Sequence, residues 1–358
     1  HPVSSANQLL AADLSNISTR EQIDELHSLL YHLENHIGVS EDDYAVYQYP
    51  QSLIQINSNL PIFVGCPKLF RLTQDLACRV EERQIAGKRV PVRFIDFNGK
   101  ELEIVRFGDV ADVRQGLATA DNWTYLFQNP SARGSYKNIE LFKAFLLSEE
   151  ELEYISENDV LREKIISHGF HKSLDETPFD PDRWFGGRYI VPYDKGGESD
   201  TSAGWLPNYY VPTDYYIDWS SWAVHRLRTL TEFDRDGKGS KSSVLSRFQN
   251  VDYYFTKGFT LSYTGIYAPN LRLNSIGVFD VGGSSVFSEL QAQNILGKFT
   301  SKLNKYFAKV YIDQTVNFQV DENKALPFIL EESDRIKELV DSIIEKQHKD
   351  PRYPYHLY

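Results

Sequence analysis

The segment VPVRFIDFNGKELEIV, residues 90–105, decides the first part of the fold because apolar and polar residues alternate on both sides of one turn. Alternation with a period of two residues is typical of a β-strand that buries one face. Asn98-Gly99, between the two alternating runs, is a strong signal for a two-residue hairpin turn. We therefore predict an antiparallel pair of strands at 90–97 and 101–105.

Outward from this hairpin, the pattern of apolar residues changes to the spacing of helices. Strands early and late in the chain, with helices between them, indicate the α+β class: a mixed, β-rich domain with flanking helices. The segment 234–241 is rich in charge and glycine, so we predict a flexible loop there. The expected helices are 17–37, 67–80, 139–168, 289–310 and 330–347, and further strands are expected at 52–56 and 61–65.

The chain of 358 residues is long enough for more than one folded unit. We predict an N-terminal helical segment (1–43), one large domain (44–329) with a helical insertion at about 127–182, and a C-terminal helix and tail (330–358). The sequence contains no methionine, not even at position 1. Average usage predicts roughly eight in a chain of this length. We therefore expect the chain to be a fragment of a longer protein.

Composition limits where the protein works. No run of eighteen apolar residues occurs, so we expect no membrane partner and no membrane span. Cys66 and Cys78 are the only cysteines, too few for a four-cysteine zinc site or a disulfide framework. We therefore expect a reducing, cytoplasmic location.

Aromatic and basic residues concentrate in one stretch, 184–283, which holds four of the five tryptophans. Within it, residues 219–275 carry eight lysines or arginines and four carboxylates, a net charge of +4 in a chain of net charge −12. Cations neutralise phosphates and rings stack on bases, so this composition suits a nucleic-acid contact surface. Dense aromatic residues also form the cores of sheets, and this second interpretation stays open.

Several enzyme signatures are missing. The sequence has no Pro-Pro pair of an adenine-methyltransferase active site, no G-x-G-x-x-G turn, no G-x-S-x-G elbow and no H-E-x-x-H. The scattered histidines leave a Ser/His/Asp triad possible but give it no support. One arrangement is compatible with a magnesium-dependent nuclease, because Asp313, Glu322 and Lys324 have D-x8-E-x-K spacing.

The order of motifs resembles a known family. VRQGLATADN (113–122) is similar to the QGL-x-TGDN signature that opens the C-terminal target-recognition region of adenine-specific DNA methyltransferases. These include type IIG restriction–modification enzymes, PglX-like methylases of phage defence and the TaqI-like specificity domain. Ala120 stands where the family usually has glycine, the tryptophan expected after KGG is displaced to Trp205, and the segment 127–182 is longer than usual. Upstream of this signature, QSLIQINSNLPIFVG (51–65) is similar to the segment that precedes it in those proteins. Downstream, the matching motifs follow in the same order: PYDKGG (192–197), WLPNY (205–209), YIDW (216–219), RFQNVDYYF (247–255), GFTLS (258–262), GVFD (277–280), VNFQV (316–320) with LP (326–327), and IEKQHKDPRY (344–353).

This resemblance implies a division of labour. The catalytic methyltransferase domain, with its S-adenosylmethionine, and any endonuclease would precede these residues, so the chain itself would hold no cofactor, metal or catalytic residue. Its partners would be double-stranded DNA and its own methyltransferase domain. Arginine and lysine side chains would hold phosphates or read base edges in the major groove. The candidate DNA-binding residues are Arg114, Thr119, Asn122, Lys195, Arg226, Arg228, Arg235, Lys238, Lys241, Arg247, Lys257 and Arg272.

A second class of function stays open beside DNA recognition. Exposed aromatic side chains on an acidic protein also suit a carbohydrate or small-ligand module. Salt separates the two, because DNA binding weakens steeply as salt rises and sugar binding does not.

Overall fold

The computed structural model describes residues 8–13, 45–50, 79–97, 99–132, 134–196, 206–238, 244–262, 269–312, 318–350 and 353. The chain forms two compact units. The first contains residues up to Asp109 together with 301–315 and 321–331, and the second contains 110–300, 316–320 and 332–358. The large domain predicted at 44–329 therefore contributes residues to both units.

The first unit is built on the predicted hairpin. Strands β4 (Lys88–Phe97) and β5 (Lys100–Arg106) pair antiparallel with Phe97 opposite Lys100, which confirms the turn expected at Asn98-Gly99. Gly99 has a φ of +80°, a left-handed value that favours glycine. The sheet has the order β15-β5-β4-β3, with β3 at Arg79–Ile85 and β15 at Pro327–Ile329.

The remaining described elements of the first unit are short. Strands β1 (Gln8–Asp13) and β2 (Ala45–Pro50) pair antiparallel. Helix α4 (Phe107–Val110) follows β5, and its Phe107 ring packs against Phe328 of β15. Its other described helices are α11 (Lys302–Phe307), the π-helical turn η7 (Ala308–Ile312) and α12 (Val320–Ala325).

The described residues of the second unit form two sheets. The first has the order β13-β9-β10-β7-β8 and the second, fully antiparallel, has the order β12-β11-β14-β6. In the five-stranded sheet, β13 runs parallel to β9, and β8 runs parallel to β7. The strands are β6 (Asp112–Arg114), β7 (Leu126–Gln128), β8 (Lys137–Asn138), β9 (Ile190–Asp194), β10 (Tyr215–Asp218), β11 (Phe259–Ser262), β12 (Asn270–Leu273), β13 (Val278–Phe279) and β14 (Ser285–Phe287).

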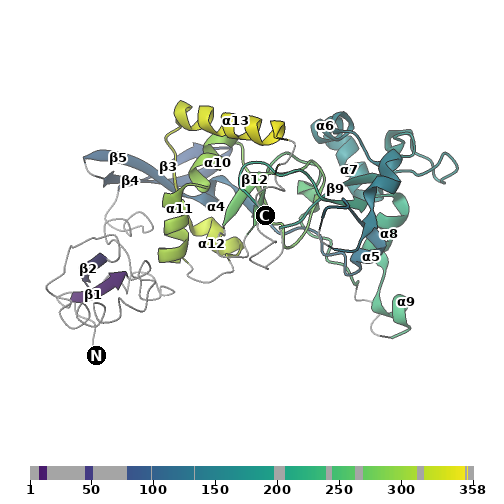
Figure 1. Cartoon of the computed structure of the whole chain (residues 1–358), viewed down its shortest axis with the longest axis horizontal. Coiled ribbons are helices and arrows are strands. Elements are labelled where there is room, and N and C mark those ends of the chain that lie inside the picture. Colours follow the sequence, from purple (N-terminus) through teal and green to yellow (C-terminus); the bar gives the residue numbers. More distant parts are fainter. Residues whose placement is uncertain are drawn as a thin grey trace. The chain divides into compact units, whose positions relative to one another are not determined.

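Helices cover the five-stranded sheet, and Figure 1 shows α6, α7 and α8 gathered near β9. The expected helical content of 139–168 is confirmed as η4, α6 and α7, with Ser148 and Glu151 forming a capping box at the start of α6. The helices of this unit are α5 (Asn122–Tyr125), η4 (Ile139–Phe145), α6 (Glu149–Glu157), α7 (Asp159–His168), η5 (Pro181–Arg183), α8 (Ser221–Thr229), α9 (Glu232–Asp236), η6 (Val251–Tyr253), α10 (Ala292–Phe299) and α13 (Asp334–Lys349).

The aromatic stretch supplies much of this core. Trp219 is fully buried, donates its indole N–H to the carbonyl of Ile165 at 3.0 Å, and stacks on Phe248 at 5.6 Å. Tyr254 and Phe255 are also fully buried. The interpretation of this stretch as packing therefore holds for these four rings.

The C-terminal helix is confirmed, and it packs on α10 (Figure 1). Gly297 of α10 makes the close approach possible, because a Cβ there would lie 2.4 Å from Ile336 of α13. The prediction of one helix over 289–310 is wrong. Ser301 adopts an extended backbone and caps a new helix by accepting from the N–H of Asn304.

Two further predictions need correction. Part of the expected loop 234–241 is helical, because the Thr231 hydroxyl accepts from the N–H of Asp234 and begins α9. Residues 79–80, expected at the end of a helix, belong to β3. The helix expected at 17–37, the strands expected at 52–56 and 61–65, and residues 67–78 lie outside the described residues.

Candidate nucleic-acid interface

The loop of the VRQGLATADN motif joins the two sheets of the second unit. After β6, the N–H of Gly116 donates to the carbonyl of Asp280 (3.1 Å), and that of Leu117 donates to Phe279 (2.8 Å). A Cβ at Gly116 would lie 1.8 Å from the carbonyl oxygen of Phe279. Only glycine allows this backbone approach, which anchors the loop beside β13.

The glycine of the PYDKGG motif meets the same segment. A Cβ at Gly196 would lie 1.7 Å from the carbonyl oxygen of Gly282. Gly283 is also confined, because a Cβ there would lie 2.6 Å from the carbonyl oxygen of Asp194. The two motifs therefore converge on residues 279–283, although about 80 residues of chain separate them.

The motif then turns into the short helix α5. The Asp121 carboxylate caps this helix by accepting from the N–H of Thr124 at 3.3 Å and from its hydroxyl at 2.6 Å. The buried Thr119 hydroxyl donates to Asn122 Oδ1 at 2.5 Å. Asn122 Nδ2 in turn donates to the Tyr136 hydroxyl at 3.3 Å. These bonds fix the loop, and they occupy two of the candidate DNA-binding side chains, Thr119 and Asn122.

Ala120 occupies the turn with a φ of +59°, in the left-handed region that favours glycine. We predict that Ala120→Gly raises the free energy of unfolding by about 0.5–1 kcal/mol, because relief of backbone strain exceeds the entropy that glycine adds to the unfolded chain. Urea denaturation measures the change. Ala118→Gly is the matched control and should destabilise, since Ala118 has no left-handed backbone. An unchanged or lower stability for Ala120→Gly would contradict the inferred strain.

Cations and aromatic rings lie around α5. Lys195 Nζ is 3.5 Å from the Tyr136 hydroxyl and 4.7 Å from the centre of the Tyr215 ring. Arg226, in the last turn of α8, lies 5.1 Å from the Trp222 ring and hydrogen-bonds the side chain of Tyr125. Figure 1 places α5 next to α8. These contacts bring parts of the sequence together that are up to 100 residues apart.

Two tryptophans beside these cations are exposed. Trp123 is 62% exposed and contacts the edge of Tyr136, and Trp222 is 50% exposed and lies 6.3 Å from Tyr125. A large apolar ring held in solvent is available to stack on a partner. Arg247 completes the group: its backbone pairs with Ala118 of the loop, and its side chain is exposed. We call these residues, Trp123, Tyr136, Lys195, Trp222, Arg226 and Arg247, the α5 surface.

Four of the other candidate cations are engaged with partners in the protein. Arg114 pairs with Asp112 at 3.0 Å, Lys257 pairs with Glu153 at 3.1 Å, and Arg235 pairs with its neighbour Asp236. Arg228 donates to the carbonyl of Ile166 at 3.1 Å and lies over the ring of Phe248 at 4.1 Å. Lys238 is exposed just after α9, and Lys241 lies outside the described residues.

Arg272 is the clearest departure from the expected DNA contacts. Its side chain is buried, and its guanidinium donates to the Ser262 hydroxyl (2.9 Å) and to the carbonyl of Lys195 (2.7 Å). A buried guanidinium that already donates to acceptors within the protein is not available to contact DNA. Arg272 therefore belongs to the core between β12 and the PYDKGG segment.

Sequence reasoning missed the residues that the fold adds to this surface. Trp123 lies within α5 and Tyr136 contacts it, but both residues precede the aromatic stretch 184–283. Lys172 pairs with Asp218 at 3.0 Å and lies 5.8 Å from Trp222, and Lys137 donates to the carbonyl of Thr124. The only sequence signal for Trp123 is that it directly follows the VRQGLATADN motif. No spacing pattern in the sequence connects Lys172 to this surface.

A pocket of about 520 Å³ opens beside α5. Its size is in the range of ligand sites. Asp280 lines it, and burial raises the pKa of this carboxyl to about 6, although the Gly283 N–H and the charge of Lys195 act in the opposite direction. The lining residues are Leu117, Ala118, Thr119, Ala120, Asp121, Asn122, Trp123, Tyr136, Tyr193, Asp280 and Val281.

The raised pKa of Asp280 has a consequence for stability. An unfolded Asp ionises near pH 4, so between about pH 4 and pH 6 the folded state binds the extra proton and the free energy of unfolding falls as pH rises. Asp280→Asn removes this loss. We predict that the stability of the variant relative to the native chain increases by about 1–3 kcal/mol from pH 4 to pH 7. Denaturant unfolding at each pH measures it, and a pH-independent difference would contradict the shift. The charged groups near Asp280 are Asp194, Lys195 and Arg272.

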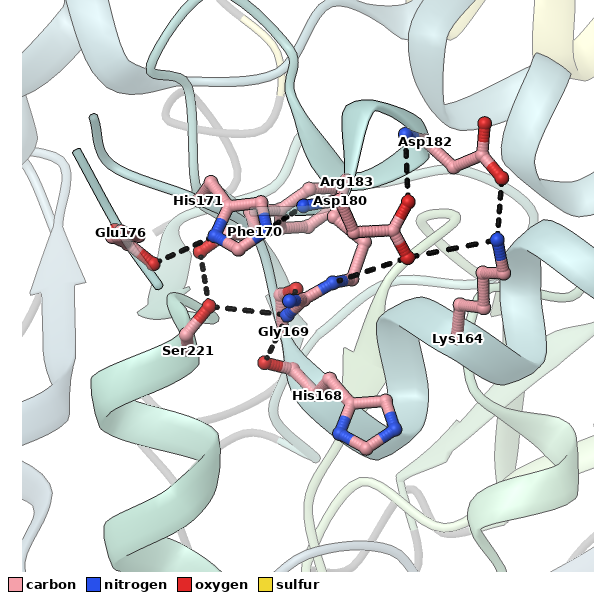
Figure 2. Close-up of polar contacts among 10 residues, drawn as sticks. All are labelled: Lys164, His168, Gly169, Phe170, His171, Glu176, Asp180, Asp182, Arg183 and Ser221. Carbon is pink, nitrogen blue, oxygen red and sulfur yellow. Dashed lines mark hydrogen bonds and ion pairs between the residues drawn. The ribbon is translucent and has the colours of Figure 1, made fainter. Parts of the chain in front are cut away.

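A hydrogen-bonded cluster near η5 tests the hydrolase alternative (Figure 2). His171 is buried, its Nδ1 is 2.8 Å from Glu176, and its Nε2 accepts from the N–H of Asp180 at 2.9 Å. Nδ1 therefore carries the proton. The Ser221 hydroxyl donates to the carbonyl of Phe170 at 3.1 Å. Since both ring nitrogens of His171 are already used, it is not placed to activate Ser221 as a base.

Arg183 holds the same cluster together. Its guanidinium donates to the carbonyls of His168 (2.9 Å) and Gly169 (3.0 Å) and to the Ser221 hydroxyl (3.2 Å). Gly169 lies at the end of α7 with a φ of +68°. The cluster joins the end of α7 to the start of α8, so its role is structural.

The residues of the nuclease alternative divide between described and undescribed parts of the chain. Glu322 and Lys324 lie on α12, whereas Asp313 falls outside the described residues. Within the described ranges, no group of three or more His, Cys, Asp or Glu side chains is placed to hold a metal ion. No helix in those ranges has the length and apolar character needed to cross a membrane. No protein-family model and no curated protein matches the chain.

Proposed function

We propose that this chain is a sequence-specific DNA-binding module, the target-recognition part of a type IIG-like restriction–modification adenine methyltransferase. The observation that carries the proposal is the α5 surface. Three cations from distant parts of the chain and two exposed tryptophans gather around one motif-bearing loop. The cations suit phosphates, and the rings suit bases or sugars.

The arrangement of the two motif glycines supports the same proposal. Gly116 and Gly196 both permit backbone approaches to residues 279–283, so the motifs that resemble the methyltransferase family form one framework under the α5 surface. A rigid framework is what a recognition site requires, since base readout depends on the position of each side chain. The family resemblance further implies a methyltransferase domain, with S-adenosylmethionine, as a partner, and a cytoplasmic setting.

The acidic character of the chain shapes the proposed binding. With a net charge of −12, most of the protein repels DNA, which confines contact to the α5 surface and makes binding sensitive to salt. Fluorescence anisotropy with a labelled duplex tests this. If three phosphates are contacted, affinity should fall roughly 40-fold between 50 and 200 mM salt. No duplex binding at 50 mM salt would overturn the proposal.

One rival function is tested by the same titration. The exposed Trp123 and Trp222 also suit a carbohydrate. Sugar binding that is independent of salt, together with absence of duplex binding, would favour that module instead.

A further inference from the structure

The pocket beside α5 differs in chemistry from the α5 surface itself. Two carboxylates, Asp121 and Asp280, line it together with the rings of Trp123 and Tyr136. Carboxylates repel phosphate, so the pocket is not a continuation of a phosphate track. Acceptors combined with aromatic walls suit a planar ligand that donates hydrogen bonds.

Asp280, one of the residues that line this pocket, is held in place by hydrogen bonds. Its N–H donates to the carbonyl of Asp194 at 3.0 Å, and its carbonyl accepts from Gly116 at 3.1 Å. One carboxylate oxygen, Oδ1, accepts from the N–H of Gly283. Among the residues that the structure describes, Oδ2 makes no hydrogen bond. A fixed carboxylate with acceptor capacity left over can receive N–H donors from a ligand.

Among nucleobases, guanine matches this arrangement. Its N1–H and 2-amino group point the same way from one edge, so a single carboxylate can accept from both. Adenine and cytosine offer an amino group beside a ring acceptor, which an ionised carboxylate does not bind well. The rings of Trp123 and Tyr136, whose planes are 77° apart, provide a face and an edge for stacking. Lys195, 3.5 Å from the Tyr136 hydroxyl, would hold the phosphate on the sugar that carries the base.

We propose that this pocket binds one unpaired guanine base, with Asp280 accepting from its Watson–Crick edge and Trp123 and Tyr136 contacting its ring. This inference rests on the proposed function and adds a ligand to it. The guanine comes either from a strand of DNA, displaced from its stack, or from a free nucleotide. An ammonium ligand fits less well, because Lys195 already places a positive charge near Asp280.

Binding of mononucleotides to the full chain tests the chemistry. GMP should bind at least about tenfold more tightly than IMP, which lacks the 2-amino group, and than AMP. Asp280→Asn should abolish this difference and improve the binding of xanthosine monophosphate, whose 2-oxo group accepts from the new amide. Trp123→Leu should weaken all nucleotides alike. Asp252→Asn, an exposed carboxylate on η6, is the matched control and should change nothing.

Oligonucleotides distinguish the two sources of guanine. A duplex with one unpaired guanine should bind more tightly than one with an unpaired thymine, and Asp280→Asn should remove the preference. A preference seen with GMP but not with the duplex assigns the pocket to a free nucleotide. Equal affinity for GMP, IMP and AMP, and for both duplexes, would overturn the inference. If the guanine preference is absent but the affinity for a fully paired duplex still falls as salt rises, the proposed DNA-binding function stands and only the guanine pocket is rejected.

Discussion

Gly116→Ala is expected to lower the free energy of unfolding of the second unit by about 3 kcal/mol or more. The added Cβ would lie 1.8 Å from the Phe279 carbonyl oxygen and 2.5 Å from the Phe279 ring. Both neighbours are fixed, since Phe279 is buried in β13 and its carbonyl accepts from Leu117. Overpacking of this kind costs about 1–3 kcal/mol in cores that can adjust, and more where backbone must move.

Gly282→Ala is the matched control for this experiment. A Cβ at Gly282 would meet its nearest neighbour, the Asp280 carboxylate, at 3.5 Å, an ordinary contact. We therefore expect a change below about 1 kcal/mol in the control. Urea denaturation followed by tryptophan fluorescence reports on both variants because Trp219 is in the core. Equal stability of the two variants would show that the loop is not anchored at Phe279.

Arg272→Ala is expected to lower the free energy of unfolding by about 3–5 kcal/mol, because it removes a buried cation and leaves buried polar groups without their hydrogen-bond donor. The Ser262 hydroxyl and the carbonyl of Lys195 each lose a donor, and the buried carboxyl of Asp194 loses the positive charge of Arg272, which opposes the effect of burial on its pKa. Burial already raises the pKa of Asp194, so loss of Arg272 should raise that pKa further.

Arg247→Ala tests the proposal that this exposed arginine contacts DNA. Arg247 is exposed, and its side chain has no hydrogen bond or ion pair with the described residues. Its replacement should change stability by less than about 0.5 kcal/mol while weakening duplex binding. The reverse pattern, a stable Arg272→Ala and an unstable Arg247→Ala, would contradict the assignment of the two residues.

Local patterns in the sequence predicted the elements that depend on neighbouring residues alone. The hairpin of β4 and β5 follows from alternation and one turn, and α13 follows from its apolar stripe. The break between α10 and α11 was missed because Ser301 is compatible with a helix interior and with a cap, and tertiary packing selects the cap.

The candidate site was only partly predictable for a related reason. Motif order pointed to the 113–122 loop and to Lys195, and both lie at the α5 surface. Charge counting could not tell a buried arginine such as Arg272 from an exposed one such as Arg247, since the difference depends on where β12 lies. The pocket residue Asp280 joins the loop only through strand pairing, which leaves no local pattern.

The most direct test of the account is the salt dependence of duplex binding by a triple variant, Lys195→Gln/Arg226→Gln/Arg247→Gln. The control variant, Lys337→Gln/Lys346→Gln/Lys349→Gln, removes the same charge from α13. We predict that the α5-surface variant loses affinity more than tenfold at 50 mM salt and that its log–log salt slope decreases by about three, one for each phosphate contact. The control should keep the native slope. Equal slopes and affinities for the two variants would contradict the claim that DNA binds at the α5 surface.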